Sequence, residues 1–232
     1  MKKIAKFLIT FISSSLAVST LAAEVPLCQL PQANTNTAAG EPSNAACSQV
    51  LEAAKKLAEA SKSQLNFFNS STIPSQLNVG SVYLQPITML PTGMMLPRKQ
   101  SDIHLELDIH AQQNLKARGF APGDWLPNVT VSYTIQKIGD KSPLPCSSMS
   151  TARKYTCLLM PMVASDGPHY GNNVKLQGPG FYLVTFNATT ANSHFGWHTD
   201  TDSKVLGTEY VDWHFTQSYI FKWTGVGKIG GY

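Results

Sequence analysis

The chain has 232 residues, of which 43% are hydrophobic and 14% are charged, and its formal net charge is +4 at neutral pH. This length suits one large domain, or a modest domain with an added segment. No basic cluster interleaves with aromatic residues, which argues against a nucleic-acid-binding protein.

The first 23 residues have the composition of a secretory signal peptide. Three lysines lie within the first six residues, an apolar stretch covers 7–16, and small residues precede Ala22 and Ala23. We therefore predict export across a membrane, with cleavage near Ala22 or Ala23. Loss of three lysines would leave a net charge of about +1. The alternative is a retained membrane anchor, for which the apolar stretch is short.

The four cysteines are an even set in a chain predicted to be exported, so disulfides are expected. Three connectivities are possible, and proximity in the sequence favours Cys28–Cys47 and Cys146–Cys157. A thiolate metal site is the competing interpretation, but no Cys-x-x-Cys spacing supports it.

Residues 24–78 are predicted to form an N-terminal extension. Residues 24 to about 42 are rich in Pro, Asn, Thr, Ala and Gly and are expected to be a flexible lead-in. Apolar residues then recur at helical spacing, which predicts a helix over about 45–65. Residues 66–80 are again loop-like.

From residue 79 to residue 232 the pattern changes to short alternating strands separated by Pro- and Gly-containing turns. The clearest strands are Val82–Ile87, Ile103–His110, Val129–Gln136, Thr156–Met160, Phe181–Phe186 and Tyr219–Trp223. About seven such strands predict an all-β sandwich, with the helix as an appendage.

The strand Ile103–His110 alternates aliphatic residues with His104, Glu106, Asp108 and His110. Successive side chains of a strand point to opposite faces, so these four polar residues share one face. His104 and Glu106 would have Cα atoms about 6.6 Å apart and could approach one ion, whereas His104 and His110, about 20 Å apart, could not. The alternative is a solvated polar face.

Two further segments carry metal-ligand chemistry. Met162 and His169 flank a predicted turn at 165–168, which would fold His169 back toward Met162. A thioether with an imidazole suits copper and tolerates ferrous iron, although Met162 could simply pack in the core. The loop 194–200 contains His198 and Asp200, and Asp200 could orient an imidazole.

Several segments together are similar to the bacterial periplasmic iron-transport family, which includes pathogen-specific membrane antigens. The resemblance covers about 79–232 but not 24–78. It is carried by Val82–Ile87, Asp102–Ala111, Met162–Gly171, Lys175–Gly180, His198–Asp200 and Gly225–Tyr232. The chain departs from the family pattern at Thr88–Leu90, where an acidic pair is expected, and at Trp197, where an arginine is expected.

The resemblance implies an immunoglobulin-like β-sandwich, usually a homodimer, that binds copper and iron and works beside an inner-membrane permease. Manganese or zinc could substitute for iron. Carried over to matching positions, it implies the metal ligands His104, Glu106, Met162, His169 and His198.

We therefore expect a non-enzymatic periplasmic protein, without a membrane anchor, that captures copper and ferrous iron and delivers iron to a permease. A copper-dependent oxidase acting on Fe(II), or a metal-dependent hydrolase, is one alternative, but the chain has no nucleophile elbow, His-Glu-x-x-His helix or phosphate loop. An adhesive or chaperone-like sandwich with incidental histidines is another.

Overall fold

The computed structural model describes residues 25–26, 28–29, 45–60, 73, 76–113, 115, 119–140, 142–145, 157–191 and 213–225. The predicted signal peptide, Cys146 and His198 lie outside the described residues. Within the described part of the chain, no helix is long and apolar enough to cross a membrane.

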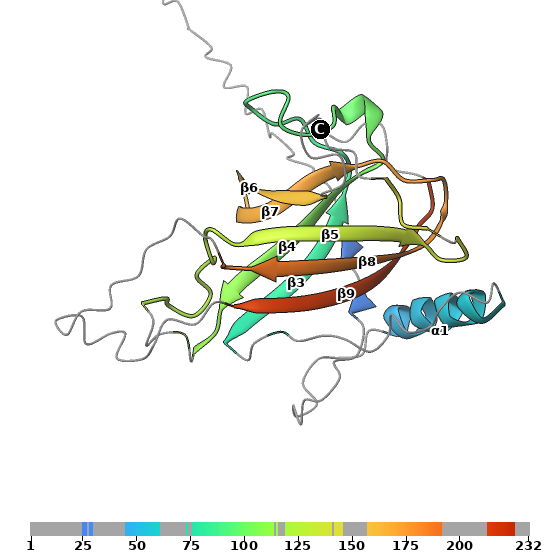
Figure 1. The fold of residues 1–232 in the computed structure, drawn as a ribbon, viewed down its shortest axis with the longest axis horizontal. Helices are drawn as coiled ribbons and strands as arrows, with labels where there is room; N and C mark the ends of the chain where they lie inside the picture. Colours follow the sequence, from blue (N-terminus) through green and yellow to red (C-terminus); the bar gives the residue numbers. More distant parts are fainter. Residues whose placement is uncertain are drawn as a thin grey trace, which may run out of the picture.

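The described chain consists mostly of β-strands, which confirms the predicted all-β class (Figure 1). The elements are β1 (Val25–Pro26), β2 (Cys28–Gln29), α1 (Ala45–Ala60), β3 (Leu77–Leu84), a 3-10 turn η2 (Arg98–Gln100), β4 (Ile103–Ala111), β5 (Thr130–Lys137), β6 (Leu158–Ala164), β7 (Gly167–Val174), β8 (Gly180–Thr189) and β9 (His214–Trp223). All six strands predicted above are present with shifted ends, and α1 begins at the predicted residue.

The strands form two antiparallel layers that make a sandwich. One layer has the order β1-β3-β4-β7-β6 and the other the order β5-β8-β9-β2. Figure 1 shows β5, β8 and β9 running across β3 and β4. A short pairing of β5 with β6, at Val131↔Leu159 and Ser132↔Leu158, joins the layers into one nine-stranded sheet.

The core lies between the layers, and the aliphatic half of β4 contributes a row of residues to it. Ile103, Leu105, Leu107 and Ile109 are fully buried against side chains of the opposite layer. Burial of each such side chain contributes roughly 1.5–3 kcal/mol relative to exposure. These four residues therefore anchor β4 rigidly, and they fix which way its polar residues point.

The N-terminal segment joins the outer edges of the two layers. Val25 of β1 pairs with Tyr83 of β3, and Cys28 of β2 pairs with Ile220 of β9. No strand was predicted in the lead-in, but β1 and β2 form there because unpaired edge strands offer free N–H and C=O groups to any extended segment. The segment 25–29 thus closes both edges.

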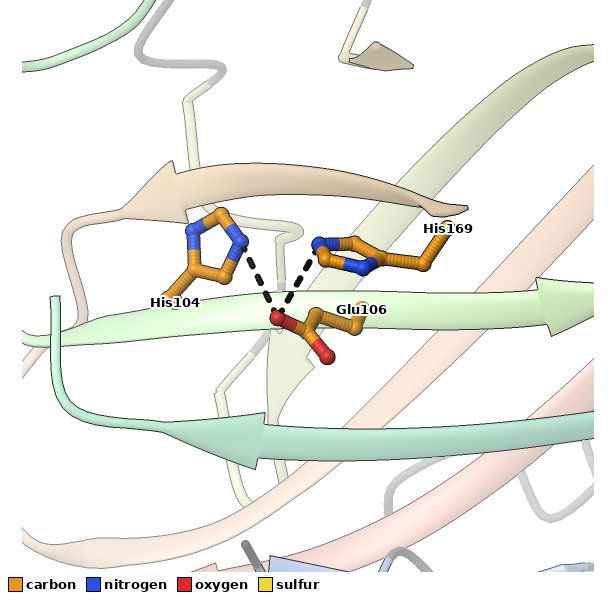
Figure 2. A group of neighbouring side chains, drawn as sticks. All are labelled: His104, Glu106 and His169. Carbon is orange, nitrogen blue, oxygen red and sulfur yellow. Dashed lines mark ion pairs between the residues drawn. The ribbon is translucent and has the colours of Figure 1, made fainter. Parts of the chain in front are cut away.

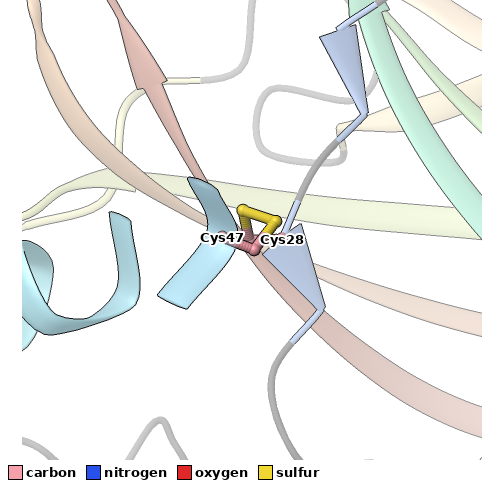
Figure 3. Close-up of a disulfide and its surroundings, with 2 residues drawn as sticks. All are labelled: Cys28 and Cys47. Carbon is pink, nitrogen blue, oxygen red and sulfur yellow. A yellow bond between two sulfur atoms is a disulfide. The ribbon is translucent and has the colours of Figure 1, made fainter. Parts of the chain in front are cut away.

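A disulfide between Cys28 and Cys47 fastens α1 beside β2, which confirms one predicted pairing (Figure 3). The helix packs Ala54 against Leu183 of β8 and Ile220 of β9 in a small apolar cluster. Cys157 is also disulfide-bonded, and Cys146, the partner predicted for it, lies outside the described residues.

We expect removal of this disulfide to weaken the fold without affecting a distant site. The cysteines are 19 residues apart, so the cross-link should contribute about 3 kcal/mol by restricting the unfolded chain. Urea unfolding of a Cys28→Ser/Cys47→Ser variant should show that loss. An unchanged unfolding midpoint would mean that packing alone holds the N-terminal segment.

Candidate metal centre

The register of three strands gathers polar side chains on one face of the sheet. In β4 and β7, His104 lies opposite Asn173 and Glu106 lies opposite Gly171. In the β6–β7 hairpin, Met162 lies opposite His169. Residues opposite each other on antiparallel strands point to the same side of the sheet. The predicted return of His169 toward Met162 is therefore confirmed by the hairpin register.

Three of these side chains converge on one point (Figure 2). The Oε1 atom of Glu106 lies 3.4 Å from His104 Nε2 and 3.2 Å from His169 Nε2. Candidate ligand atoms of the three residues all lie within 4.8 Å of one another. His104 is 0% exposed, His169 is 4% exposed and Glu106 is 5% exposed. The group is thus compact and buried.

Both ring nitrogens that face Glu106 lack a hydrogen-bond partner. His104 Nε2 and His169 Nε2 are buried, and no group within the described part of the chain has hydrogen-bond geometry to either. Leaving a buried polar atom unsatisfied costs about 1–3 kcal/mol. Two such nitrogens facing one carboxylate form a donor set that could hold a cation, which would take a lone pair from each nitrogen.

Gly171 leaves open the space beside these donors. A Cβ atom at this position would lie 2.6 Å from His104 Nε2 and 3.1 Å from Met162 Sδ. The imidazole nitrogen and the thioether sulfur therefore border the same small volume, which a side chain at position 171 would fill. Nitrogen, oxygen and sulfur donors together suit copper and accept ferrous iron.

Burial keeps the His104 ring neutral. It lowers the pKa of His104 from its ordinary value of 6.5 to about 4, an effect that the hydrogen bond to Asn173 partly opposes and that nearby His169 reinforces. The neutral ring is the form that binds a metal. Further along the strand, burial raises the pKa of the Asp108 carboxyl.

The predicted ligands thus have different positions. His104, Glu106, Met162 and His169 lie together, whereas His198 lies outside the described residues. Asp108 is half-buried further along β4. His110 lies at its far end, where the Nδ1–H group donates a hydrogen bond to the Gly123 carbonyl at 2.9 Å.

Sequence reasoning missed Gly171 and Asn173 as parts of this site. Both residues alternate with His169 along β7, so they lie on the same face as that ligand candidate. The signal was a two-residue period starting at His169, but the sequence prediction places only a turn at 165–168 and no strand after it.

This chain is similar to several known proteins. The family model of the Fe2+ transport protein matches residues 67–225. A UPF0423 protein of Brucella abortus is 41% identical over 160 residues, covering 67% of this chain and 80% of the relative.

Two solved structures share the fold. A copper-bound variant of FetP from uropathogenic Escherichia coli strain F11 is 36% identical, with a TM-score of 0.56, over 67% of this chain and 90% of the other. Copper-reconstituted P19 protein from Campylobacter jejuni is 34% identical, with a TM-score of 0.55, over 66% and 92%.

Proposed function

Because this chain belongs to the Fe2+ transport protein family, we propose that it captures copper and ferrous iron in the periplasm and delivers iron to an inner-membrane permease. The family and the copper-bound structures similar to this chain support metal binding in iron uptake. Beyond metal binding in iron uptake, the proposal names copper and ferrous iron as the bound metals, the periplasm as the compartment, and an inner-membrane permease as the recipient of the iron.

The observation that carries the proposal is the pair of unsatisfied imidazole nitrogens facing Glu106. We propose His104, Glu106, Met162 and His169 as ligands, with His198 completing the set. The protein would act as a homodimer, as the family resemblance implies. The ligand His198 would then come from the same chain or from the second copy.

Binding, and not catalysis, is favoured by the burial of the donors. A hydrolytic metal needs an open position for water or substrate. Here the three converging residues are at most 5% exposed. A mixed set of hard and soft donors on a rigid sheet can instead hold either metal without transforming it.

The proposal is tested by titrating the metal-free protein with Cu(I), Cu(II) and Fe(II), and by replacing the thioether. Met162→Leu keeps the side-chain volume but removes the sulfur, so Cu(I) affinity should fall about tenfold while Fe(II) affinity changes less. Met94→Leu is the matched control, because Met94 is 48% exposed in a loop.

Absence of stoichiometric binding by the wild-type protein would contradict the proposed function. Equal Cu(I) affinity of the wild-type and Met162→Leu proteins would remove Met162 from the ligand set. Rapid Fe(II) oxidation by the copper-loaded protein would instead support an oxidase. Iron uptake by cells carrying the variants tests delivery to the permease.

A further inference from the structure

Asn173 is the residue that contacts the far side of the His104 ring. The two residues lie directly opposite each other on β7 and β4. Asn173 Oδ1 lies 2.9 Å from His104 Nδ1, and both side chains are 0% exposed. Bulk solvent therefore does not reach this contact.

The orientation of the Asn173 amide is fixed by three other hydrogen bonds. Its Nδ2 group donates to the carbonyl oxygens of Ile87 and Leu96, each at 2.8 Å. Its Oδ1 atom also accepts the backbone N–H of Ile87 at 3.2 Å. A flipped amide would place Oδ1 against two carbonyl oxygens and the NH2 group against an N–H. Only one orientation satisfies every partner.

This orientation determines where His104 carries its proton. An oxygen that can only accept faces Nδ1, so Nδ1 must carry the hydrogen. In a neutral ring Nε2 then keeps its lone pair. Nε2 is the atom that lies 3.4 Å from Glu106 Oε1 and borders the space left by Gly171.

We infer that Asn173 is a positioning residue that fixes the tautomer and the ring orientation of His104, and so presents Nε2 to the metal. The inference rests on the proposed function, because it gives His104 the role of a ligand. A hydrogen-bond acceptor on the distal ring nitrogen is a general means of holding a metal-binding histidine in place.

The same amide also supports the loop over this part of the sheet. Ile87 and Leu96 lie at the two ends of segment 87–96, and Asn173 holds a backbone carbonyl at each end. Loss of the side chain would therefore release the loop and the ring together. A test must separate these two effects.

The separating measurement is 15N NMR of the metal-free protein labelled at histidine. The wild-type protein should show His104 with hydrogen on Nδ1 and a lone pair on Nε2. Asn173→Leu should lose this preference and bind copper about 10- to 100-fold more weakly. Asn173→Asp keeps an acceptor for Nδ1–H, so it should keep the tautomer of His104. It has no NH2 group to donate to the two loop carbonyls, so it should lose the support of the loop.

Asn172→Leu is the matched control. Asn172 is the adjacent buried asparagine, its Nδ2 group donates to the Leu158 carbonyl at 2.9 Å, and it points to the opposite face of β7. Its replacement should leave both the tautomer of His104 and the copper affinity unchanged.

The outcomes separate this inference from the proposed function. If the wild-type protein binds no metal, the proposed function fails, while the NMR measurement still tests the role of Asn173. A folded Asn173→Leu protein with an unchanged tautomer and unchanged copper affinity would overturn the inference. If Asn173→Leu does not fold, the Asn173→Asp protein provides the test of the inference. A His104 ring that carries its hydrogen on Nε2 in that protein would overturn the inference.

Discussion

Replacement of Gly171 by alanine should lower copper affinity more than about 100-fold, equivalent to about 2.7 kcal/mol. The added Cβ would lie 2.6 Å from His104 Nε2, closer than atoms in contact allow. It would also lie 3.1 Å from the Met162 sulfur. The methyl group would fill the space that the ion needs, or push the imidazole away from it. Isothermal titration with copper measures the loss.

Gly80→Ala provides the matched control for this experiment. Gly80 also lies within a strand, β3, and a Cβ there would meet nothing within 4 Å. Both variants carry the same chemical change, so their difference isolates the space beside His104. Circular dichroism should confirm that each variant keeps the sheet. Copper binding by a folded Gly171→Ala protein with wild-type affinity would mean that the ion does not occupy this space.

The part of the site on β4 could be predicted because it is encoded in one strand. Alternation along Ile103–His110 separates a core face from a polar face within the sequence itself. The sequence could not show that the polar face of β4, which carries His104 and Glu106, is buried as well as the core face. That burial depends on what the folded chain packs over the strand.

The part of the site on β7 depends on pairing between distant segments. Gly167–Val174 contains glycine, proline and asparagine, which are depleted in strands, and it forms a strand because β4 and β6 flank it. Gly171 and Asn173 gain their roles only from their register against Glu106 and His104. A local pattern carries no such register.

The N-terminal strands were missed for the same reason. Val25–Pro26 and Cys28–Gln29 are too short to give a periodic signal, and the edges of β3 and β9 impose their extended conformation. Proximity in the sequence, by contrast, correctly favoured the Cys28–Cys47 pairing.

Acid should destabilise the metal-free protein through His104 over a defined pH range. The pKa of His104 is about 4 in the folded chain, against an ordinary value of 6.5. Between these values the unfolded chain binds a proton that the folded chain does not. Stability is therefore lost as pH falls from about 6.5 to about 4, by about 3 kcal/mol in total at 1.36 kcal/mol per pKa unit.

Urea unfolding of the metal-free protein at several pH values between 7 and 4 measures this loss. His104→Gln lacks the titrating ring, so its stability should fall less over the same range, and the difference between the two curves is the contribution of His104. Parallel curves would show that the ring is as easily protonated in the folded chain as in the unfolded chain.

Copper should stabilise the folded protein less at low pH if His104 is a ligand. A metal that binds only the folded state stabilises it by an amount that grows with free metal concentration. Protons and copper then compete for the same nitrogen, so the copper-dependent stabilisation should itself shrink as pH falls toward and below the folded-state pKa of about 4. A stabilisation by copper that does not shrink as pH is lowered past about 4, and that is equal in His104→Gln, would place the ion away from the His104 ring.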